Sequence, residues 1–268
     1  LNQTSDYSGL RLPVGTTGNI EETFTTDYLV VGGGGGSGTI SGAGGAGGLR
    51  TSYNNSTTTT NSLSFPSGKT AVATYMLNNN ANDVSGNYNG TETNITYAQG
   101  KYGGAAVFNG SSSKIDLGGS IISVGSFTVS LWLNANNVTT AGRAFHLGQG
   151  DNVSNISIFV ASGNLTLRFL DSGSNLRDAS ITASTNTWYH AVITFDSSTN
   201  ILKSYVNDTE ELSVTTSGFS TLGNYGLIGA RAYNNDQFFN GKIDQVRIYD
   251  TALSSTDVSN IYNNEVQA

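Results

Sequence analysis

The chain has 268 residues with a formal net charge of −7 at pH 7, and only 12% of its residues are charged. This acidic balance, without a basic stripe to neutralise phosphates, argues against a nucleic-acid partner. The chain contains no cysteine, which excludes disulfides and thiolate metal sites, and no apolar run near the roughly 20 residues that would span a bilayer.

The first 68 residues differ in composition from the rest. Residues 1–27 are a polar N-terminal arm, and residues 28–68 are a glycine-rich segment and connector. The glycines match a dinucleotide-binding pattern, but no amphipathic helix follows and no acidic residue stands about 20 residues downstream to hold a ribose. We therefore do not expect nucleotide binding.

Two interpretations of the glycine tract stay open. It forms a flexible linker, or its glycines let the backbones of several copies of the chain approach closely. The Val and Ile residues that flank the tract favour ordered packing between copies, and we expect a homotrimer. Because the sequence begins at Leu1 rather than Met, we also expect it to be a piece of a longer protein.

From residue 69 onward, apolar and polar residues alternate in segments that recur about every ten residues, which is typical of an all-β sandwich. Strands are predicted near 71–77, 105–109, 113–117, 126–134, 143–148, 154–160, 164–170, 176–182, 187–196, 200–206, 210–215, 225–231 and 238–249. The last strand slips once out of phase at Gln245–Val246. We expect it to pair with residues 105–110, so that the two ends of the domain close one sheet. A further predicted strand segment, 114–118, follows that partner in the sequence.

Two local signals accompany these strands. Asn207 and Asp208 occupy a predicted hairpin turn, since both residue types tolerate the backbone conformations that such turns require. A short C-terminal helix is predicted where Ser254 and Asp257 form a capping box before an apolar helical face.

Several ordered motifs carry a family resemblance. They are Ala106–Gly110, Ser126–Leu133, Thr187–Asp196, Tyr205–Asn207 and Asn240–Tyr249, with the tail Thr251–Val258. In this order they resemble the laminin-G-like, concanavalin A-like jelly roll. The resemblance implies an all-β fold, an antiparallel two-sheet jelly-roll sandwich, over residues 69–268. The arm and the glycine-rich segment resemble parts of phage tail-fibre and other virion proteins.

A turn rich in side-chain oxygens begins at Asp83 and ends at Gly90. Calcium prefers six to eight oxygen ligands, and a turn of this kind supplies several of them. In the resembled family, an Asp-x-Ser-Gly-Asn loop contributes to a calcium site together with the closing strand. The resemblance thus implies a structural Ca²⁺ held by Asp83, Asn87, Asn89, Asn109 and Asp244. The alternative is a hydrogen-bonded Asx-turn corner without a metal.

Sugar sites combine aromatic rings, which cover the apolar faces of the sugar, with amides and carboxylates that orient its hydroxyl groups. The loop 225–239 is the richest cluster of such residues. The predicted ligand-binding residues are Tyr225, Arg231, Tyr233, Asn235 and Asp236. The alternative is an ordinary polar loop whose aromatic residues fold into the core.

Catalytic side chains are scarce. Glycosidases need a pair of carboxyl groups about 5–5.5 Å or about 6.5–9.5 Å apart, and no Glu-x-Asp-x-x-Glu strand occurs in this sequence. His146 and His190 alternate with apolar residues and are interpreted as structural. We expect no catalytic residues and no enzymatic activity.

The leading hypothesis is a virion protein, a tail-fibre or capsid-fibre subunit outside the cell. Its arm and glycine-rich segment would join it to other fibre subunits, and its jelly roll would bind host-surface glycans during attachment. One alternative is a bacterial secreted or cell-surface carbohydrate-binding adhesin. Another is a decoration subunit that binds nothing. No nucleic-acid partner and no membrane insertion are expected.

Overall fold

The computed structural model describes residues 29–31, 49–51, 66, 68–119, 121–122, 125–148, 154–219, 225–232 and 234–264. The chain divides into two units, Leu1–Thr57 and Thr58–Ala268. In the first unit, β1 (Leu29–Val31) pairs antiparallel with β2 (Leu49–Thr51). The predictions for the arm, the glycine tract and most of the connector lie outside the described residues.

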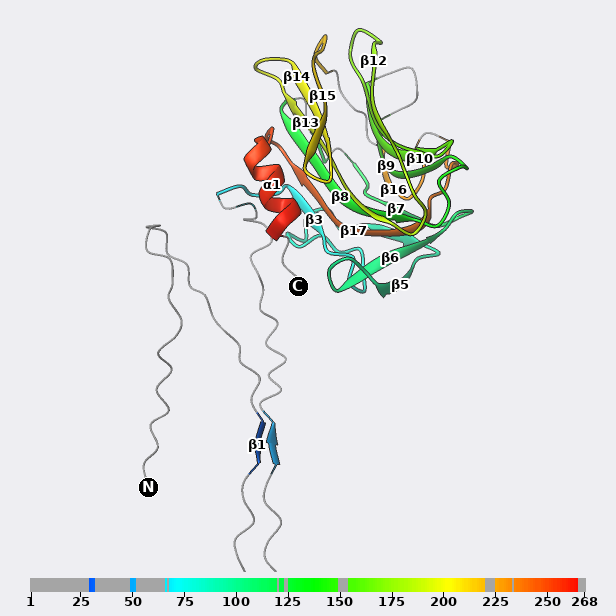
Figure 1. The fold of residues 1–268 in the computed structure, drawn as a ribbon, viewed down its shortest axis with the longest axis vertical. Coiled ribbons are helices and arrows are strands. Elements are labelled where there is room, and N and C mark those ends of the chain that lie inside the picture. Colours follow the sequence, from blue (N-terminus) through cyan, green and yellow to red (C-terminus); the bar gives the residue numbers. More distant parts are fainter. Residues whose placement is uncertain are drawn as a thin grey trace, which may run out of the picture. The chain divides into compact units, whose positions relative to one another are not determined.

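The second unit is a sandwich of two antiparallel sheets (Figure 1), which confirms the predicted jelly-roll class. One sheet has seven strands in the order β12-β11-β10-β9-β16-β7-β4, and the other has eight, β15-β14-β13-β8-β17-β6-β5 with β3 beside β17. Their bounds are β3 Ala73–Tyr75, β4 Thr91–Thr93, β5 Thr96–Gln99, β6 Gly104–Asn109, β7 Lys114–Asp116, β8 Phe127–Ala135, β9 Gly142–Gly148, β10 Asn155–Ala161, β11 Asn164–Leu170, β12 Leu176–Thr182, β13 Trp188–Asp196, β14 Ile201–Val206, β15 Thr209–Thr215, β16 Gly226–Ile228 and β17 Asn240–Tyr249.

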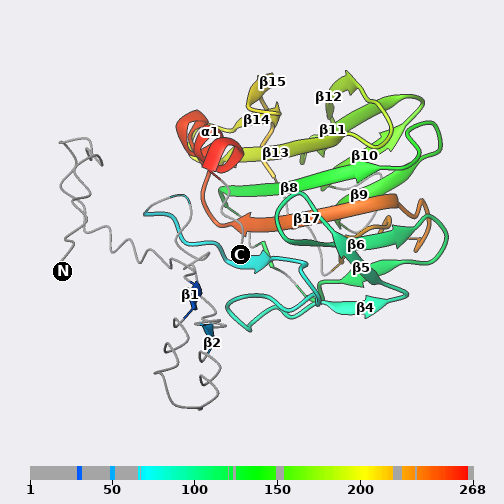
Figure 2. The ribbon, with the colours of Figure 1, turned by 60° about the horizontal axis from the view of Figure 1, so that its bottom comes forward.

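The last strand, β17, lies between β8 and β6 inside the eight-stranded sheet (Figure 2). Its residues 240–243 pair with residues 106–109 of β6, which confirms the predicted pairing of the two ends. Gln245 has a φ of 50°, and the register with β8 shifts between Asp244 and Arg247. The predicted slip of phase is therefore a β-bulge.

The segment that follows leaves this sheet, because β7, within residues 114–118, pairs with β16 and β4 in the seven-stranded sheet. The reason is the turn after β6. The Asn109 Oδ1 atom accepts the backbone N–H groups of Ser111, Ser112 and Ser113 at 2.9, 2.9 and 3.1 Å. This Asx-type turn redirects the chain from one layer to the other.

Strands β4 and β5 were not predicted. Both are short, and most of their side chains are exposed. Because neither strand has a buried face, the alternation that marks the longer strands is absent from them. They lie at the ends of the two sheets, where short strands limit unwanted pairing with other chains.

The core lies between the two sheets and is built from the alternating apolar residues of both. Part of it is a cluster of aromatic rings from β8, β11, β13 and residue 219. The centroid of Phe169 lies 4.9 Å from that of Phe219, 5.7 Å from that of Phe195 and 6.4 Å from that of Phe127. Contacts of this kind add specific geometry to the burial of apolar surface.

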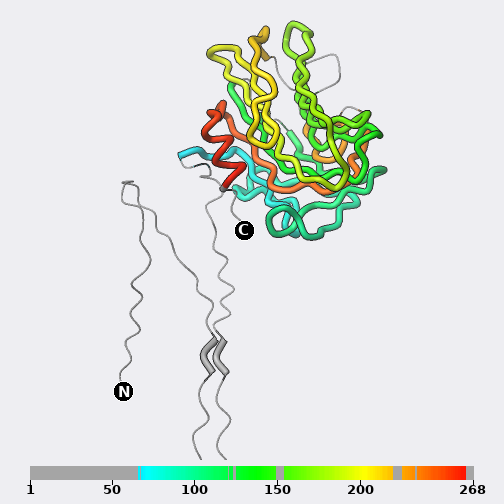
Figure 3. The backbone as a smooth tube through the Cα atoms, viewed as in Figure 1, coloured from blue at the N-terminus to red at the C-terminus, as the bar shows by residue number. Residues whose placement is uncertain are grey.

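Helix α1 (Ser255–Asn264) covers part of the outer face of the eight-stranded sheet (Figure 3, red). Val258 and Ile261 are buried there in one cluster with Val192 of β13. The predicted capping box is confirmed: Ser254 Oγ donates to Asp257 Oδ2 at 2.7 Å, and the Asp257 N–H donates to Ser254 Oγ at 3.2 Å. The described part of the chain has no helix long and apolar enough to cross a membrane.

Candidate ligand-binding face

The outer face of the seven-stranded sheet is polar. In β10, Ile156 and Ile158 belong to the core, so Ser157 and Phe159 point to the opposite side, because neighbouring strand residues alternate. The cross-strand registers place Arg168 and His146 beside Ser157, and Asp178 beside Arg168. We use the term sheet face for Arg143, His146, Ser157, Phe159, Arg168 and Asp178.

Two arginines flank the ring of Phe159. The Cζ atom of Arg143 lies 4.2 Å from the ring centroid, and that of Arg168 lies 5.0 Å from it. Guanidinium groups at such distances are attracted by the electron-rich ring. Arg143 is only 4% exposed and also donates from Nη1 to the hydroxyl of Ser157. The ring and the two cations therefore form one rigid group.

Arg168 is held by a second contact. Its Nε donates to Asp178 Oδ1 at 2.9 Å, and its Nη2 donates to Asp178 Oδ2 at 2.7 Å. This is the two-pronged geometry that makes arginine–carboxylate pairs directional. Both side chains remain more than a quarter exposed, so the pair lies at the surface of the sheet face.

Residues 229–232 and 234–239, here called the 229–239 loop, fold over β9 and cover part of the sheet face. Arg143 donates from its backbone N–H to the carbonyl of Gln237 at 2.8 Å and from its Nε to Gln237 Oε1 at 2.9 Å. His146 Nδ1 accepts the N–H of Ala232 at 3.3 Å, so this ring nitrogen carries no proton. Both side chains are thus buried by the loop that they hold in place.

The loop is also braced from within. Arg231 donates from Nε and Nη2 to the two carboxylate oxygens of Asp236, at 2.7 and 2.6 Å. The hydrogen bonds from Arg231 are the main cause that lowers the pKa of Asp236 below its ordinary value. This carboxylate is therefore anionic at neutral pH.

The structure places four of the predicted ligand residues in the segments just before and after β16. Arg231 and Asp236 form the ion pair inside the loop, and Asn235 accepts from Lys114 Nζ at 2.6 Å. Tyr225 is 55% exposed and precedes β16, where its carbonyl accepts the N–H of Gly148. Tyr233 lies outside the described residues.

Three of the predicted calcium ligands share one turn. The Asp83 carboxylate accepts the N–H of Thr74 at 2.8 Å and of Tyr88 at 3.3 Å, and the Ser85 hydroxyl. Asn89 Oδ1 accepts the N–H of Asp83 at 3.0 Å, and Asn87 is exposed beside them. A calcium ion at this turn would have to take over oxygens that accept N–H and O–H groups.

The other two predicted calcium ligands are separated from each other along β17. Asn109 pairs with Asn240 of β17, whereas Asp244 stands four residues further along that strand, a distance of about 13 Å. Asp244 Oδ2 accepts the N–H groups of Lys101 and Tyr102, both at 2.9 Å. No group of three or more His, Cys, Asp and Glu side chains placed to hold a metal occurs among the described residues.

Asp244 is fully buried, and burial raises the pKa of its carboxyl group to about 6. Gly100 permits the close approach of the 100–103 turn, since a Cβ atom there would lie 2.5 Å from Asp244 Oδ2.

His190 lies on the same outer face of the eight-stranded sheet as Asp244, and its Nε2 forms a hydrogen bond with Ser130 Oγ at 2.8 Å. Burial lowers the pKa of His190 to about 3, and its buried, hydrogen-bonded ring is what the prediction of a structural histidine requires.

Comparison with known families accounts for this architecture. A laminin-G-type family model, described as the concanavalin A-like lectin/glucanases superfamily, matches residues 108–259, more than half of the chain. The chain belongs to this superfamily. A search of curated proteins gave no match.

Solved structures of the superfamily's fold include domain 4 of AbnA, a GH43 extracellular arabinanase from Geobacillus stearothermophilus, in complex with arabinotriose. It is 30% identical, with a TM-score of 0.62, and the match covers 72% of this chain and 98% of that domain. The binding domain of Paraclostridial Mosquitocidal Protein 1 is 20% identical, with a TM-score of 0.57 over 69% of this chain and 49% of that one.

A third structure is the ligand binding domain of botulinum neurotoxin serotype D in complex with N-acetylneuraminic acid. It is 17% identical, with a TM-score of 0.56 over 73% of this chain and 51% of that one. The chain spans about half the length of these two toxin domains, which share its fold at low identity.

Sequence reasoning about this superfamily member missed the sheet face. Arg143, Phe159 and Arg168 belong to three different strands, and their proximity depends on registers that the sequence does not reveal. One signal was present. Arg168 stands at a polar position of the alternation in 164–170, and Asp178 stands at the matching position of the next strand.

Proposed function

We propose that this chain is a lectin-like module that binds an oligosaccharide on the outer side of the seven-stranded sheet, between Tyr225 and the exposed Arg168–Asp178 pair of the sheet face. The observation that carries the proposal is the 30% identity to an arabinanase domain that was solved with arabinotriose, over 98% of that domain. Arabinotriose is the ligand of that domain. For this chain the proposal is limited to the chemical class, an oligosaccharide.

The geometry of the sheet face supports this class of ligand. Tyr225 is in phase with Leu227, which belongs to a separate buried cluster on the outer side of β16, opposite His146. Its exposed ring therefore stands on the same side as Arg168 and Asp178, three and four strands away in the sheet. Strand spacing places Tyr225 about 14 Å from β11, a span that suits an extended chain of several sugar rings.

Each end of that span offers a different contact. Tyr225 supplies an aromatic surface for the C–H face of a sugar. Arg168 and Asp178 supply donors and acceptors whose directions are set by their own ion pair. We propose binding without catalysis, because Asp178 and Asp236 are each held by an arginine fork, and Asp116, which stands opposite Leu227, accepts the N–H of Gly118 at 2.9 Å.

The experiment is a glycan array with the full chain, followed by calorimetry on the best saccharide. Tyr225→Ala should weaken binding about tenfold, the equivalent of about 1.4 kcal/mol. The matched variant Tyr225→Phe keeps the ring and should bind within about twofold of the parent chain. Absence of any array signal contradicts the function, whereas unchanged binding by Tyr225→Ala contradicts the placement of the ligand.

We extend this proposal to an extracellular fibre protein of a virion, a homotrimer that uses the jelly roll for attachment to host glycans. The charge-poor composition, the glycine-rich segment and the β1–β2 pair that flanks it support this role. Immunogold microscopy of particles and cells from the producing host tests it. Labelling of the cell surface without labelling of particles would favour a bacterial adhesin instead.

A further inference from the structure

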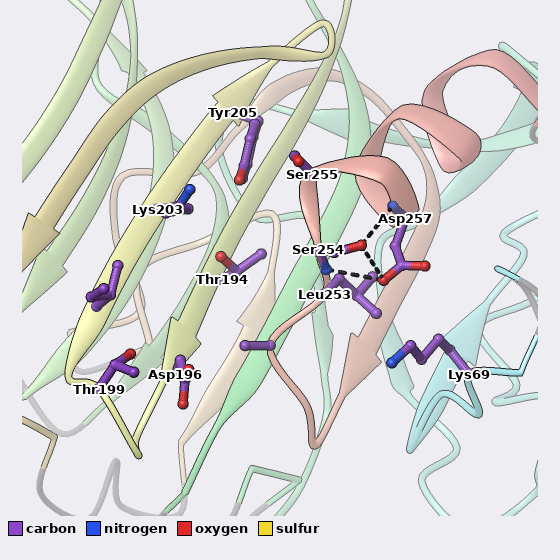
Figure 4. Close-up of a pocket in the computed structure, with 12 residues that line it drawn as sticks. Lys69, Thr194, Asp196, Thr199, Lys203, Tyr205, Leu253, Ser254, Ser255 and Asp257 are labelled. Carbon is purple, nitrogen blue, oxygen red and sulfur yellow. Dashed lines mark hydrogen bonds between the residues drawn. The ribbon is translucent and has the colours of Figure 1, made fainter.

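A groove lies on the eight-stranded sheet, whereas Tyr225 and the sheet face belong to the seven-stranded sheet. The groove measures about 660 Å³ and lies on the outer face of the eight-stranded sheet, beside the beginning of helix α1 (Figure 4). Its volume is within the range of small-molecule sites. The groove shares no lining residue with the sheet face or with the 229–239 loop.

The floor of the groove is the surface of two paired strands. Thr194 of β13 stands opposite Lys203 of β14, and Tyr205 lies one step along the same face. One wall is the segment that leaves β17. Thr128 Oγ1 donates to the carbonyl of Thr251 at 2.8 Å and accepts the N–H of Leu253 at 2.9 Å. These two bonds hold the wall at a fixed distance from the floor.

Polar groups in the groove are already oriented. Glu210, just outside it, accepts from Lys203 Nζ at 2.8 Å and from the Tyr205 hydroxyl at 3.2 Å. On the opposite side, Asp257 is fixed by the capping box with Ser254. A ligand that enters the groove therefore meets donors and acceptors whose rotamers are set before binding, which reduces the entropy that binding costs.

The lining has no excess charge. The lining carries two lysines, Lys69 and Lys203, and two aspartates, Asp196 and Asp257. Lys203 is also paired with Glu210 just outside the groove. Hydroxyl groups stand between these charges, and apolar side chains such as Leu253 complete the lining. An anion or a cation would gain from one pair of residues and be repelled by the other. A neutral molecule with both C–H surfaces and many hydroxyl groups can contact the charged, the hydroxyl and the apolar side chains of the lining.

We infer that this groove is a second binding site, specific for a short neutral saccharide. The inference goes beyond the proposed function, because it makes the module bivalent, with one saccharide site on each sheet. Two linked sites raise the avidity for a glycan-covered surface without a new contact at either one.

The experiment follows backbone amide shifts of the full chain by NMR during titration with millimolar arabinotriose or maltotriose. Amides of residues 194–205 and 252–257 should shift in a saturable manner, with a dissociation constant of about 1 mM or lower. Ser255→Leu places a larger apolar side chain at the mouth of the groove and should weaken this binding at least about tenfold. Thr256→Leu is the matched control, since Thr256 is exposed beside it and does not line the groove.

N-acetylneuraminic acid serves as the charged probe and should leave the groove amides unshifted. The inference is overturned if no neutral saccharide shifts the groove, if Ser255→Leu and Thr256→Leu behave alike, or if the acidic sugar binds there equally well. Shifts confined to the sheet face would sustain the proposed function and overturn the second site. Shifts confined to the groove would sustain the second site and contradict the first.

Discussion

Asp244 and His190 are the two buried titratable residues that stand on either side of Trp132 in the register of the eight-stranded sheet. Their pKa values move in opposite directions, to about 6 for Asp244 and about 3 for His190. A raised carboxyl pKa means that the native state holds the proton more tightly than the unfolded chain. Asp244 therefore contributes stability below its ordinary pKa of 3.8 that is lost as the pH rises through about 6.

The first prediction concerns Asp244→Asn. As the pH falls from about 7 to about 4, the unfolding free energy of the parent chain should rise relative to that of the variant by about 2–3 kcal/mol. Urea unfolding at a series of pH values measures this difference. A difference that stays constant with pH would show that Asp244 is ionised in the folded protein throughout.

His190→Gln is the matched test with the opposite sign. The lowered pKa of His190 means that the unfolded chain takes up the proton first, so stability is lost as the pH falls below 6.5 toward about 3. The parent chain should therefore lose stability relative to His190→Gln over the same pH range. Because the two contributions oppose each other, the parent chain should show a flatter profile than either variant.

At the scale of elements, helix α1 depends on its first turn. Ser254→Ala removes the two hydrogen bonds that the Ser254 hydroxyl makes with Asp257, leaves the one from the Ser254 backbone N–H, and should lower the unfolding free energy by about 1 kcal/mol. Thr256→Ala is the control, because Thr256 is exposed in the same turn. It should change the unfolding free energy by less than about 0.5 kcal/mol. Equal urea midpoints for the two variants would mean that packing alone holds the helix.

The turn 83–89 is the element on which the calcium prediction now depends. If it binds calcium, a concentration about 100-fold above the dissociation constant should raise the melting temperature by about 5–10 °C relative to chelator. Asp83→Asn should abolish the rise, and Glu211→Gln, which removes an exposed carboxylate elsewhere, should not. Identical melting curves in calcium and in chelator would leave the turn as a hydrogen-bonded corner.

Most elements could be predicted from the sequence because their buried and exposed residues alternate. The hairpin turn at Asn207 and Asp208 was also predictable, and both residues have positive φ values of 48° and 70°. The assignment of strands to sheets was harder. Alternation shows that Lys114–Asp116 is a strand, but only the turn at Asn109 decides which layer it joins.

The same limit applies to the candidate sites. Residues that are close in sequence, such as Arg231 and Asp236, could be predicted as a cluster. The sheet face and the groove combine residues from strands that meet only after folding. Thr194 and Ser255, for example, are 61 positions apart and line one groove.

At the scale of the whole molecule, the open question is assembly. If residues 1–57 mediate trimer formation, the full chain should have three times the monomer mass of 28.0 kDa by light scattering. The chain without residues 1–57 should have the mass of one copy. A full chain that remains monomeric over a wide range of concentration would contradict the trimer.

The position of β17 also bears on synthesis. This strand pairs with β8 on one side and with β6 and β3 on the other, yet it is the last strand of the sandwich in chain order and is therefore synthesised after all its partners. Until residue 249 emerges, two long neighbouring strands have unpaired edges, which are templates for association with other nascent chains. A premature stop before residue 240 should therefore yield insoluble material rather than a shortened soluble domain.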